Sequence, residues 1–388
     1  MSMKVLMLTC QYMPDVFGGA EKQCGRVSKG LKNKGLDVQI LTSRQQYKGK
    51  AKEVMNEVPV TRLYSPIAPD LLGRWLPFSV YWLLRVLVWG MFNHKQFDVI
   101  HCHQGKFGAF VGCCLARLFK KPILIKVGNS NQFMDFTALK AKKFVGPIMA
   151  NFVLKTKPTV VAITDVIAQN CKDFGFENII NIPNSIDVNL LDTLKYSEQS
   201  LLKSNQVINL FYHGRLESIK KVDVLMESFA LLAAEYAELH FHLIGSGSVL
   251  ASAKDYIKAQ GLDSKVTFHG EVSDPVVFIQ QFDVFVNASE AEGFSNSLLE
   301  ALLAGKVLVS TPVSGASDAI SMGNNGYVAA SFEAEDIKKS TIKGIQLHQN
   351  NSESVKAFSE QLIAKQFTVE VIADQYLALY KKLTGTTK

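Results

Sequence analysis

The feature that most constrains the fold is a strand–helix–strand alternation near the start of the chain. Residues 4–9 and 37–42 are short apolar runs typical of buried strands. Between them, residues 20–34 place Val27 and Leu31 on one face of a helix, and Gly35 ends it. A helix between two neighbouring strands makes those strands parallel. Further strands are expected at 97–103, 122–127, 159–163, 208–212, 239–244, 266–272, 282–287 and 307–310. The sequence therefore predicts an α/β protein built on parallel sheets.

Length and charge divide the chain in two. The 388 residues are enough for two domains, each with its own core. Residues 1–185 carry 25 Lys and Arg against 11 Asp and Glu, and residues 186–388 carry 17 against 24. The basic half favours an anionic surface or substrate. We expect no nucleic-acid partner, because zinc spacing, recognition motifs and long basic runs are absent.

Cysteine usage and hydropathy bear on location. The six Cys show no C-x-x-C spacing, and the chain enters a strand directly, without a secretory signal. No uncharged apolar run reaches 18 residues, so no membrane-spanning helix is expected. The sequence predicts a cytoplasmic protein with reduced thiols.

The stretch 289–301 combines a strand end, a turn and a helix start. A buried strand at 282–287 precedes it, and Glu292 and Glu300 stand eight residues apart, about 12 Å in helical rise. Free N–H groups at the helix start, near Ser295, favour an anion such as phosphate. The two carboxylates would then accept hydrogen bonds from hydroxyls on either side of that phosphate.

This stretch resembles the E-x7-E element of the retaining family 4 glycosyltransferases, also described as glycosyl transferases group 1. The segment Gly214-Arg-Leu, followed by Lys220 and Asp223, is similar to a second element of that family. Further matches are Gly18-Gly-Ala-Glu21, the His pair His101 and His103, and Ile182-Pro-Asn-Ser-Ile-Asp187. The chain departs from the family at Ser185 and Lys221, where Gly is common, in the 311–318 turn (Ser314-Gly315, Asp318), and at Asn129, which is given no role.

The resemblance implies a GT-B fold, with two Rossmann-like domains facing a cleft. The first domain would span 1–187 and bind the acceptor, and a C-terminal helix within 367–388 would cross back to complete it. Residues 188–206 would form a linker. The second domain, 207–366, would bind the nucleotide-sugar.

The resemblance also implies a role for each candidate residue. Arg215 and Lys220 would neutralise the leaving diphosphate, while Glu292 and His103 would position the transferred sugar. Glu300 would hold the ribose hydroxyls, and Glu271 and Val272 would lie in the loop that receives the base. The remaining nucleotide-sugar contacts are expected at Gly18, Gly19, Gly214, Gly293, Phe294, Ser295, Asn296 and Leu299.

The expected reaction moves a hexose or N-acetylhexosamine, with retention, from a nucleotide-diphosphate sugar to a glycan or lipid-linked acceptor in cell-surface polysaccharide or glycolipid synthesis. Uridine diphosphate is the default carrier on family frequency. No Asp-x-Asp spacing occurs, so we expect no metal and no other cofactor. Two alternative functions stay open. One is a nucleotide-sugar 2-epimerase of the same fold, and the other is a non-catalytic nucleotide-sugar-binding partner.

Two segments leave membrane contact open. Residues 71–92 hold all three Trp, and Lys140–Lys157 surround an apolar run. Each could lie on an anionic membrane, giving peripheral attachment to the inner face, or could be an ordinary helix of an α/β domain.

Overall fold

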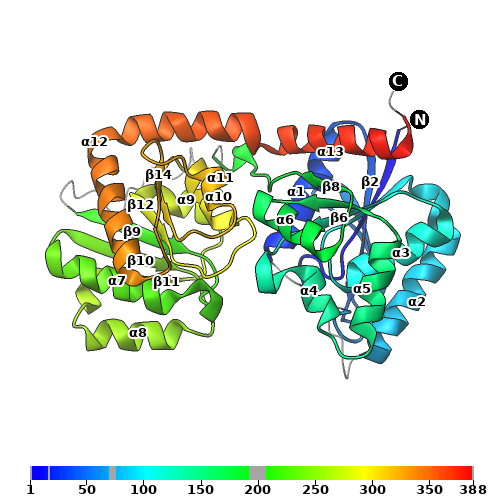
Figure 1. The fold of residues 1–388 in the computed structure, drawn as a ribbon, viewed down its shortest axis with the longest axis horizontal. Helices are drawn as coiled ribbons and strands as arrows, with labels where there is room; N and C mark the ends of the chain where they lie inside the picture. The colour runs from blue at the N-terminus through cyan, green and yellow to red at the C-terminus, as the bar shows by residue number, and fades with distance from the viewer. Residues whose placement is uncertain (1, 16–17, 70–75, 192–206, 387–388) are drawn as a thin grey trace. The chain divides into compact units, whose positions relative to one another are not determined.

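The computed structural model describes residues 2–15, 18–69, 76–191 and 207–386, and the chain divides into two compact units (Figure 1). Unit 1 comprises Met1–Ser185 and Val369–Lys388, and unit 2 comprises Ile186–Thr368. Most of the expected linker, residues 192–206, lies outside the described residues.

Unit 1 contains an eight-stranded sheet in the order β3-β4-β2-β1-β5-β6-β7-β8. All neighbours pair in parallel except β3 and β4, which form an antiparallel hairpin. The strands are β1 Lys4–Leu8, β2 Asp37–Arg44, β3 Lys52–Met55, β4 Val58–Tyr64, β5 Val99–Cys102, β6 Ile123–Val127, β7 Thr159–Ala162 and β8 Ile179–Asn181. The polar, partly basic residues 44–57 predict an exposed loop. This prediction is wrong for β3, a short edge strand that pairs on one side only.

The helices of unit 1 connect these strands. They are α1 Gly19–Asn33, α2 Leu76–Asn93, α3 Phe107–Phe119, α4 Asp135–Lys140, α5 Val145–Lys155, α6 Asp165–Phe174 and α13 Val369–Thr384. In α1, Val27 and Leu31 face the core as their spacing predicts, and Gly35, at φ 84°, ends the segment in a left-handed conformation. None of the described helices is long and apolar enough to cross a membrane.

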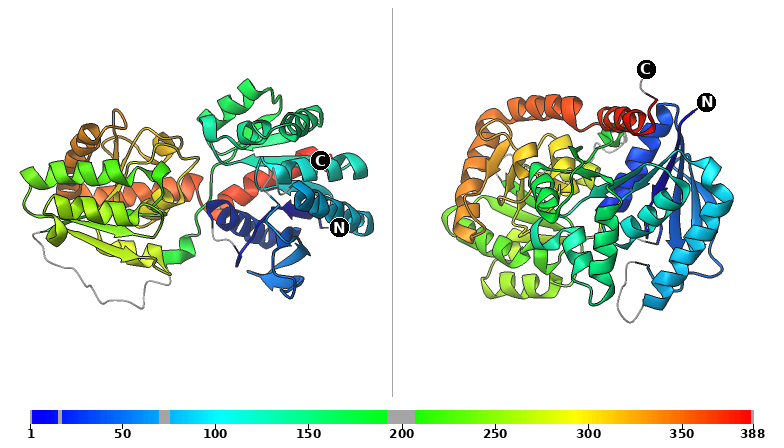
Figure 2. Two further views of the ribbon diagram at one scale, coloured as in Figure 1. Left: turned by 90° about the horizontal axis from the view of Figure 1, so that it is seen from below. Right: turned by 45° about the vertical axis from the view of Figure 1, so that its right-hand side comes forward.

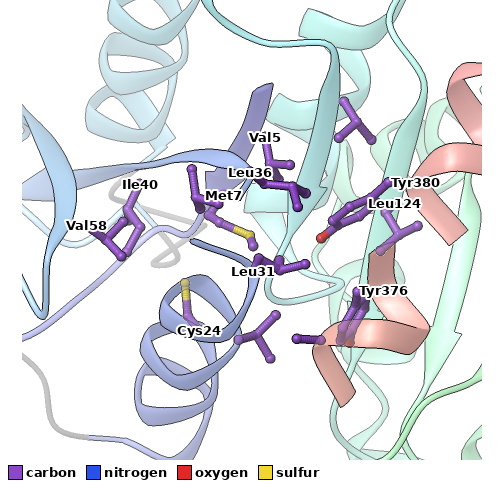
Figure 3. Close-up of a cluster of buried hydrophobic side chains, with 14 of the residues drawn as sticks. Val5, Met7, Cys24, Leu31, Leu36, Ile40, Val58, Leu124, Tyr376 and Tyr380 are labelled. Carbon is purple, nitrogen blue, oxygen red and sulfur yellow. The ribbon is translucent and has the colours of Figure 1, made fainter. Parts of the chain in front are cut away.

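The core of unit 1 joins both ends of the chain. α13 packs along α1 (Figure 1, Figure 2). Figure 3 shows Tyr376 and Tyr380 of α13 beside Met7, Leu31 and Leu124, from a strand, a helix and another strand. The last helix therefore supplies side chains to the core of the first unit.

Unit 2 contains a six-stranded parallel sheet in the order β11-β10-β9-β12-β13-β14. Its strands are β9 Ile208–His213, β10 Leu239–Ile244, β11 Val266–Gly270, β12 Val284–Asn287, β13 Val307–Ser310 and β14 Gly326–Val328. Its helices are α7 Val222–Glu235, α8 Leu250–Ala259, α9 Pro275–Phe278, α10 Asn296–Leu303, α11 Ala316–Ala319 and α12 Ala334–Gln366. The central strands are buried on both faces, as apolar runs such as Val284–Asn287 require.

Candidate active site

The first part of the site follows β9. Gly214 has φ 151°, and a Cβ there would lie 2.9 Å from the Tyr212 hydroxyl, so the position favours glycine. Arg215 comes next with an exposed side chain. The turn η4, Ser218–Lys220, then carries Lys220 to the start of α7. Ligands of open α/β sheets bind at this carboxyl edge.

Lys220 and Glu292 form an ion pair. Lys220 Nζ lies 2.5 Å from Glu292 Oε1, and the two side chains are 17% and 13% exposed. The Ser289 hydroxyl donates to the same carboxylate oxygen at 3.0 Å. These contacts hold the ammonium and the carboxylate in fixed positions beside the β9 loop. A diphosphate bound there can replace the carboxylate as the partner of the ammonium, or bind the ammonium together with it.

Glu300 lies on α10 with its carboxylate against His213, the last residue of β9. Glu300 Oε2 is 3.5 Å from His213 Nε2, which also lies 3.2 Å from the Ser297 carbonyl oxygen. Both side chains are nearly buried. His213 therefore orients the carboxylate expected to bind hydroxyls.

The start of α10 is capped from within. The Ser295 hydroxyl accepts from the Leu298 N–H at 3.3 Å, so this N–H of the first turn is already bonded within the helix. Phe294 is buried and stacks edge-on against Phe367 at 5.4 Å. Gly293 lies in the bend before α10 and Asn296 is the first residue of the helix, and their nucleotide contacts stay predictions.

Leu299 does not reach a surface. Its side chain is fully buried, and its N–H donates to the Ser295 carbonyl. The side chain of Leu299 therefore has a packing position in α10, and the nucleotide contact that the resemblance implied at this residue stays a prediction.

The loop after β11 holds the other expected nucleotide residues. The Ser246 hydroxyl donates to the carboxylate of Glu271, which is exposed, and Val272 is half-buried. The Gly245 N–H donates to the Gly270 carbonyl at 2.6 Å. These contacts tie the β11 loop to the loop after β10.

In unit 1, α1 begins at Gly19 with Gly18 as its N-cap. No side chain of the described residues caps this end, and Gly19 is exposed. A Cβ on Gly18 would overlap the Glu21 carboxylate, which is itself buried. The first-turn N–H groups of this 15-residue helix therefore lie next to Gly18, where the Glu21 carboxylate occupies the space that a Cβ would fill.

His103 follows β5 and is 3% exposed. Its Nε2 lies 3.3 Å from Met7 Sδ, and its ring stacks on His101 at 4.2 Å. His101 Nδ1 in turn lies 2.6 Å from the Tyr380 hydroxyl. Burial holds the pKa of His103 well below its usual range, with smaller contributions from His101 and Lys126. His103 is thus a neutral imidazole.

Sequence reasoning missed two residues of these sites. His213, the residue after the strand expected at 208–212, was given no role, although its contact with Glu300 follows from the packing of α10 on β9. Lys126 is the other: it is 6% exposed on β6, and its amine has no hydrogen-bond partner among the described residues. Burial lowers the pKa of the Lys126 amine to about 7. The position of Lys126 inside an otherwise apolar strand, expected at 122–127, was the feature of the sequence that could have indicated a buried amine.

Comparison with known families covers most of the chain. Residues 17–190 match the model described as Glycosyltransferase Family 4, and residues 208–346 match that of Glycosyl transferases group 1. An uncharacterized glycosyltransferase of Methanocaldococcus jannaschii is 24% identical, covering 98% of this chain and 99% of that protein. The capsular polysaccharide biosynthesis glycosyltransferase CapM of Staphylococcus aureus is 23% identical, covering 90% and 91%.

A solved structure shows the same fold. Anabaena HepE in complex with UDP-glucose superposes with a TM-score of 0.73 at 18% identity, covering 98% of this chain and 100% of that one. The expectations of a GT-B fold and of a transferase are confirmed by these matches. The chain belongs to glycosyltransferase family 4, and it is a glycosyltransferase with the GT-B fold.

Proposed function

We propose that the protein is a retaining glycosyltransferase whose donor, a nucleotide-diphosphate sugar, binds at the carboxyl edge of the unit 2 sheet. The observation that carries this proposal is the grouping of Arg215, the Lys220–Glu292 pair and the His213–Glu300 pair around β9 and α10. Two cations suit a diphosphate, and two carboxylates suit the hydroxyls of a ribose and a hexose.

The proposed step breaks the bond between the anomeric carbon and the diphosphate oxygen. Arg215 and Lys220 stabilise the charge that develops on the leaving group. The acceptor hydroxyl attacks on the same face, and its proton passes to a leaving phosphate oxygen. Glu292 orients the sugar, while His103, as a neutral imidazole, hydrogen-bonds to the sugar or the acceptor.

The donor is proposed to be UDP-linked, with a hexose or N-acetylhexosamine. HepE supports this choice, since its structure contains UDP-glucose. The acceptor is a glycan or lipid-linked glycan of cell-surface polysaccharide synthesis, a class supported by CapM. The reaction is proposed to take place in the cytoplasm. It needs no metal, because Arg215 and Lys220 supply the positive charge that stabilises the leaving diphosphate. Saturating EDTA should therefore leave the rate unchanged.

A ligand-stabilisation assay tests the donor site. Wild type, Glu300→Ala and the control Glu227→Ala, which alters an exposed glutamate of α7, are melted with UDP-, GDP- and ADP-sugars. A nucleotide-sugar at about 100 times its dissociation constant should add about 2.7 kcal/mol of stability. The shift should be present in wild type and Glu227→Ala and absent in Glu300→Ala. A melting shift that is still present in Glu300→Ala would mean that other residues bind the ribose.

The acceptor requirement tests the reaction itself. Free nucleotide should accumulate only when an acceptor glycan is added, and the product should keep the anomeric configuration of the donor in its NMR coupling constant. Nucleotide release without acceptor would favour the nucleotide-sugar 2-epimerase.

A further inference from the structure

The outer face of α2 carries an apolar stripe. Val80, Leu84, Val88 and Phe92 follow one another at a spacing of four, and Tyr81 and Met91 lie three residues from Leu84 and Val88, so all six share one helix face. They are Val80, Tyr81, Leu84, Val88, Met91 and Phe92, between 40% and 83% exposed. At about 1.5 Å per residue, the 18-residue α2 is about 27 Å long. The stripe runs along most of this length, so its apolar surface is much larger than that of a single exposed apolar side chain.

Trp82 and Trp89 are not part of the stripe, and the third tryptophan of residues 71–92, Trp75, lies outside the described residues. Trp82 is fully buried and lies 6.3 Å from Phe107 of α3, ring to ring. Trp89 stacks on buried Phe97 at 6.1 Å. The sequence left open whether residues 71–92 lie on a membrane or form an ordinary helix of the domain. The structure turns Trp82 and Trp89 inward and exposes aliphatic side chains between them.

Basic residues accompany the stripe. Residues 76–164 contain twelve Lys and Arg and only two Asp. The end of α3 lies against the end of α2, since His94 stacks on Phe119 at 5.1 Å. There Leu118 is 56% exposed. The exposed basic residues around it are Lys95, Arg117 and Lys120.

The start of α5 has the same character. Phe144 is 89% exposed and Ile148 70% exposed. Phe144 has φ 63°, which is unusual for a bulky residue. The side chains of Lys140, Lys142 and Lys143 are exposed next to it. α5 packs on α3, with Phe110 and Phe152 in edge-on contact at 5.4 Å, so α2, α3 and α5 form one helical layer (Figure 1).

We propose that this layer, the helices α2, α3 and α5 of unit 1, docks on an anionic lipid surface through the apolar stripe and the α5 start. Apolar side chains enter the headgroup boundary, and the surrounding Lys and Arg bind anionic headgroups. A second copy of the chain is a poor occupant, because a symmetric contact would oppose two basic surfaces. The inference rests on the proposed function, in which a lipid-linked acceptor would be held in that surface.

Vesicle sedimentation at low salt tests the proposal. The full chain is mixed with phosphatidylcholine vesicles, with and without 30 mol% phosphatidylglycerol. We expect binding only to the anionic vesicles and a loss of at least tenfold in the partition coefficient in Leu84→Ser/Val88→Ser/Phe92→Ser. Lys95→Glu/Lys120→Glu should lose a similar amount. The control Met322→Ser/Phe332→Ser, which changes exposed apolar residues of unit 2, should bind as wild type does.

Three results would overturn the proposal: equal binding to neutral and anionic vesicles, no loss in the stripe variant, or a wild-type dimer in sedimentation velocity that the stripe variant abolishes. The last would assign the stripe to a second copy. The nucleotide-sugar melting shift, measured on the same variants, separates this outcome from failure of the donor site, which lies in the other unit.

Discussion

In unit 2, candidate-site side chains are paired with one another, whereas the buried Lys126, His101 and His103 of unit 1 have no carboxylate partner among the described residues. In unit 2, Lys220 and Glu292 form an ion pair at 2.5 Å, and Glu300 lies next to His213. In unit 1, Lys126 and the His pair have no carboxylate within ion-pair distance among the described residues, and burial lowers the pKa of all three. The Lys220–Glu292 pair of unit 2 is thus placed for a charged ligand, while His101 and His103 of unit 1 are neutral donors and acceptors.

This difference teaches where each unit can contribute to catalysis. A diphosphate needs fixed positive charge, which only a paired or exposed cation supplies at neutral pH. An acceptor hydroxyl needs hydrogen bonds, and neutral His103 can provide these without competing for the diphosphate.

The largest expected effect is on the charged side of the comparison. Arg215→Ala should lower kcat/KM for sugar transfer by roughly 10²–10³-fold, because it removes a donor to the leaving group. The control is Lys221→Ala, a neighbouring cation that pairs with Glu290 at 3.5 Å and is 38% exposed. It should stay within a few-fold of wild type. Equal losses in the two variants would mean that general positive charge, and not the Arg215 position, matters.

Acid should test the neutral groups in both units. Burial, followed by His240 and His269, lowers the pKa of His242 to about 3. The unfolded chain therefore binds a proton near pH 6.5 that the folded chain refuses, and stability falls as pH falls through the window from about 6.5 to about 3. Between pH 7 and 4 the loss from His242 should be about 3 kcal/mol.

Urea unfolding of wild type and His242→Gln across this range measures that loss. The Gln amide can keep contact with Asn209, now 3.1 Å from His242 Nε2. The variant should show a shallower decline with acid. Parallel curves would place the acid sensitivity with His101 and His103 of unit 1 instead.

A third substitution examines the unpaired amine of unit 1. Lys126→Met should raise the free energy of unfolding at pH 7 by about 1–4 kcal/mol, since it replaces a buried ionisable group with an apolar one. Because the folded pKa of Lys126 is about 7, wild-type stability should rise between pH 7 and 10.5, and the variant should lack that rise. A less stable variant would show that Lys126 has a partner in solution.

The smallest effect concerns the contact between α13 and the His pair. Tyr380→Phe removes the hydroxyl that lies 2.6 Å from His101 Nδ1 and should cost about 1 kcal/mol of stability. Tyr64→Phe, at a residue outside the His pair, serves as the matched control and should cost less. Chemical denaturation gives both numbers, and an unchanged midpoint for Tyr380→Phe would mean that water replaces the hydroxyl.

Local patterns predicted much of this architecture. The helix expected at 20–34 is α1, Gly19–Asn33, because its apolar spacing and its flanking glycines are encoded within the segment itself. The strand, turn and helix around Glu292 and Glu300 follow from equally local signals. The family assignment rested on such segments in order and was confirmed by the matches over both units.

What the sequence could not predict depends on contacts between distant segments. The pairing of His213 with Glu300 requires α10 to pack over the end of β9. The outward face of α2 was equally hidden, because nearly every residue of Leu76–Asn93 is apolar and no polar face marks the solvent side. β3 was missed because its sequence, Lys-Glu-Val-Met, does not alternate polar and apolar residues, and a half-exposed edge strand does not require that it should.

The position of α13 has a consequence for synthesis of the chain. Tyr376 and Tyr380 belong to the core of unit 1, yet they follow the whole of unit 2 in sequence. During translation the first 185 residues leave the ribosome well before these side chains exist. The part of the unit 1 core that α13 covers therefore stays exposed to solvent until unit 2 and α13 have been synthesised. An exposed apolar surface of this kind is what chaperones bind.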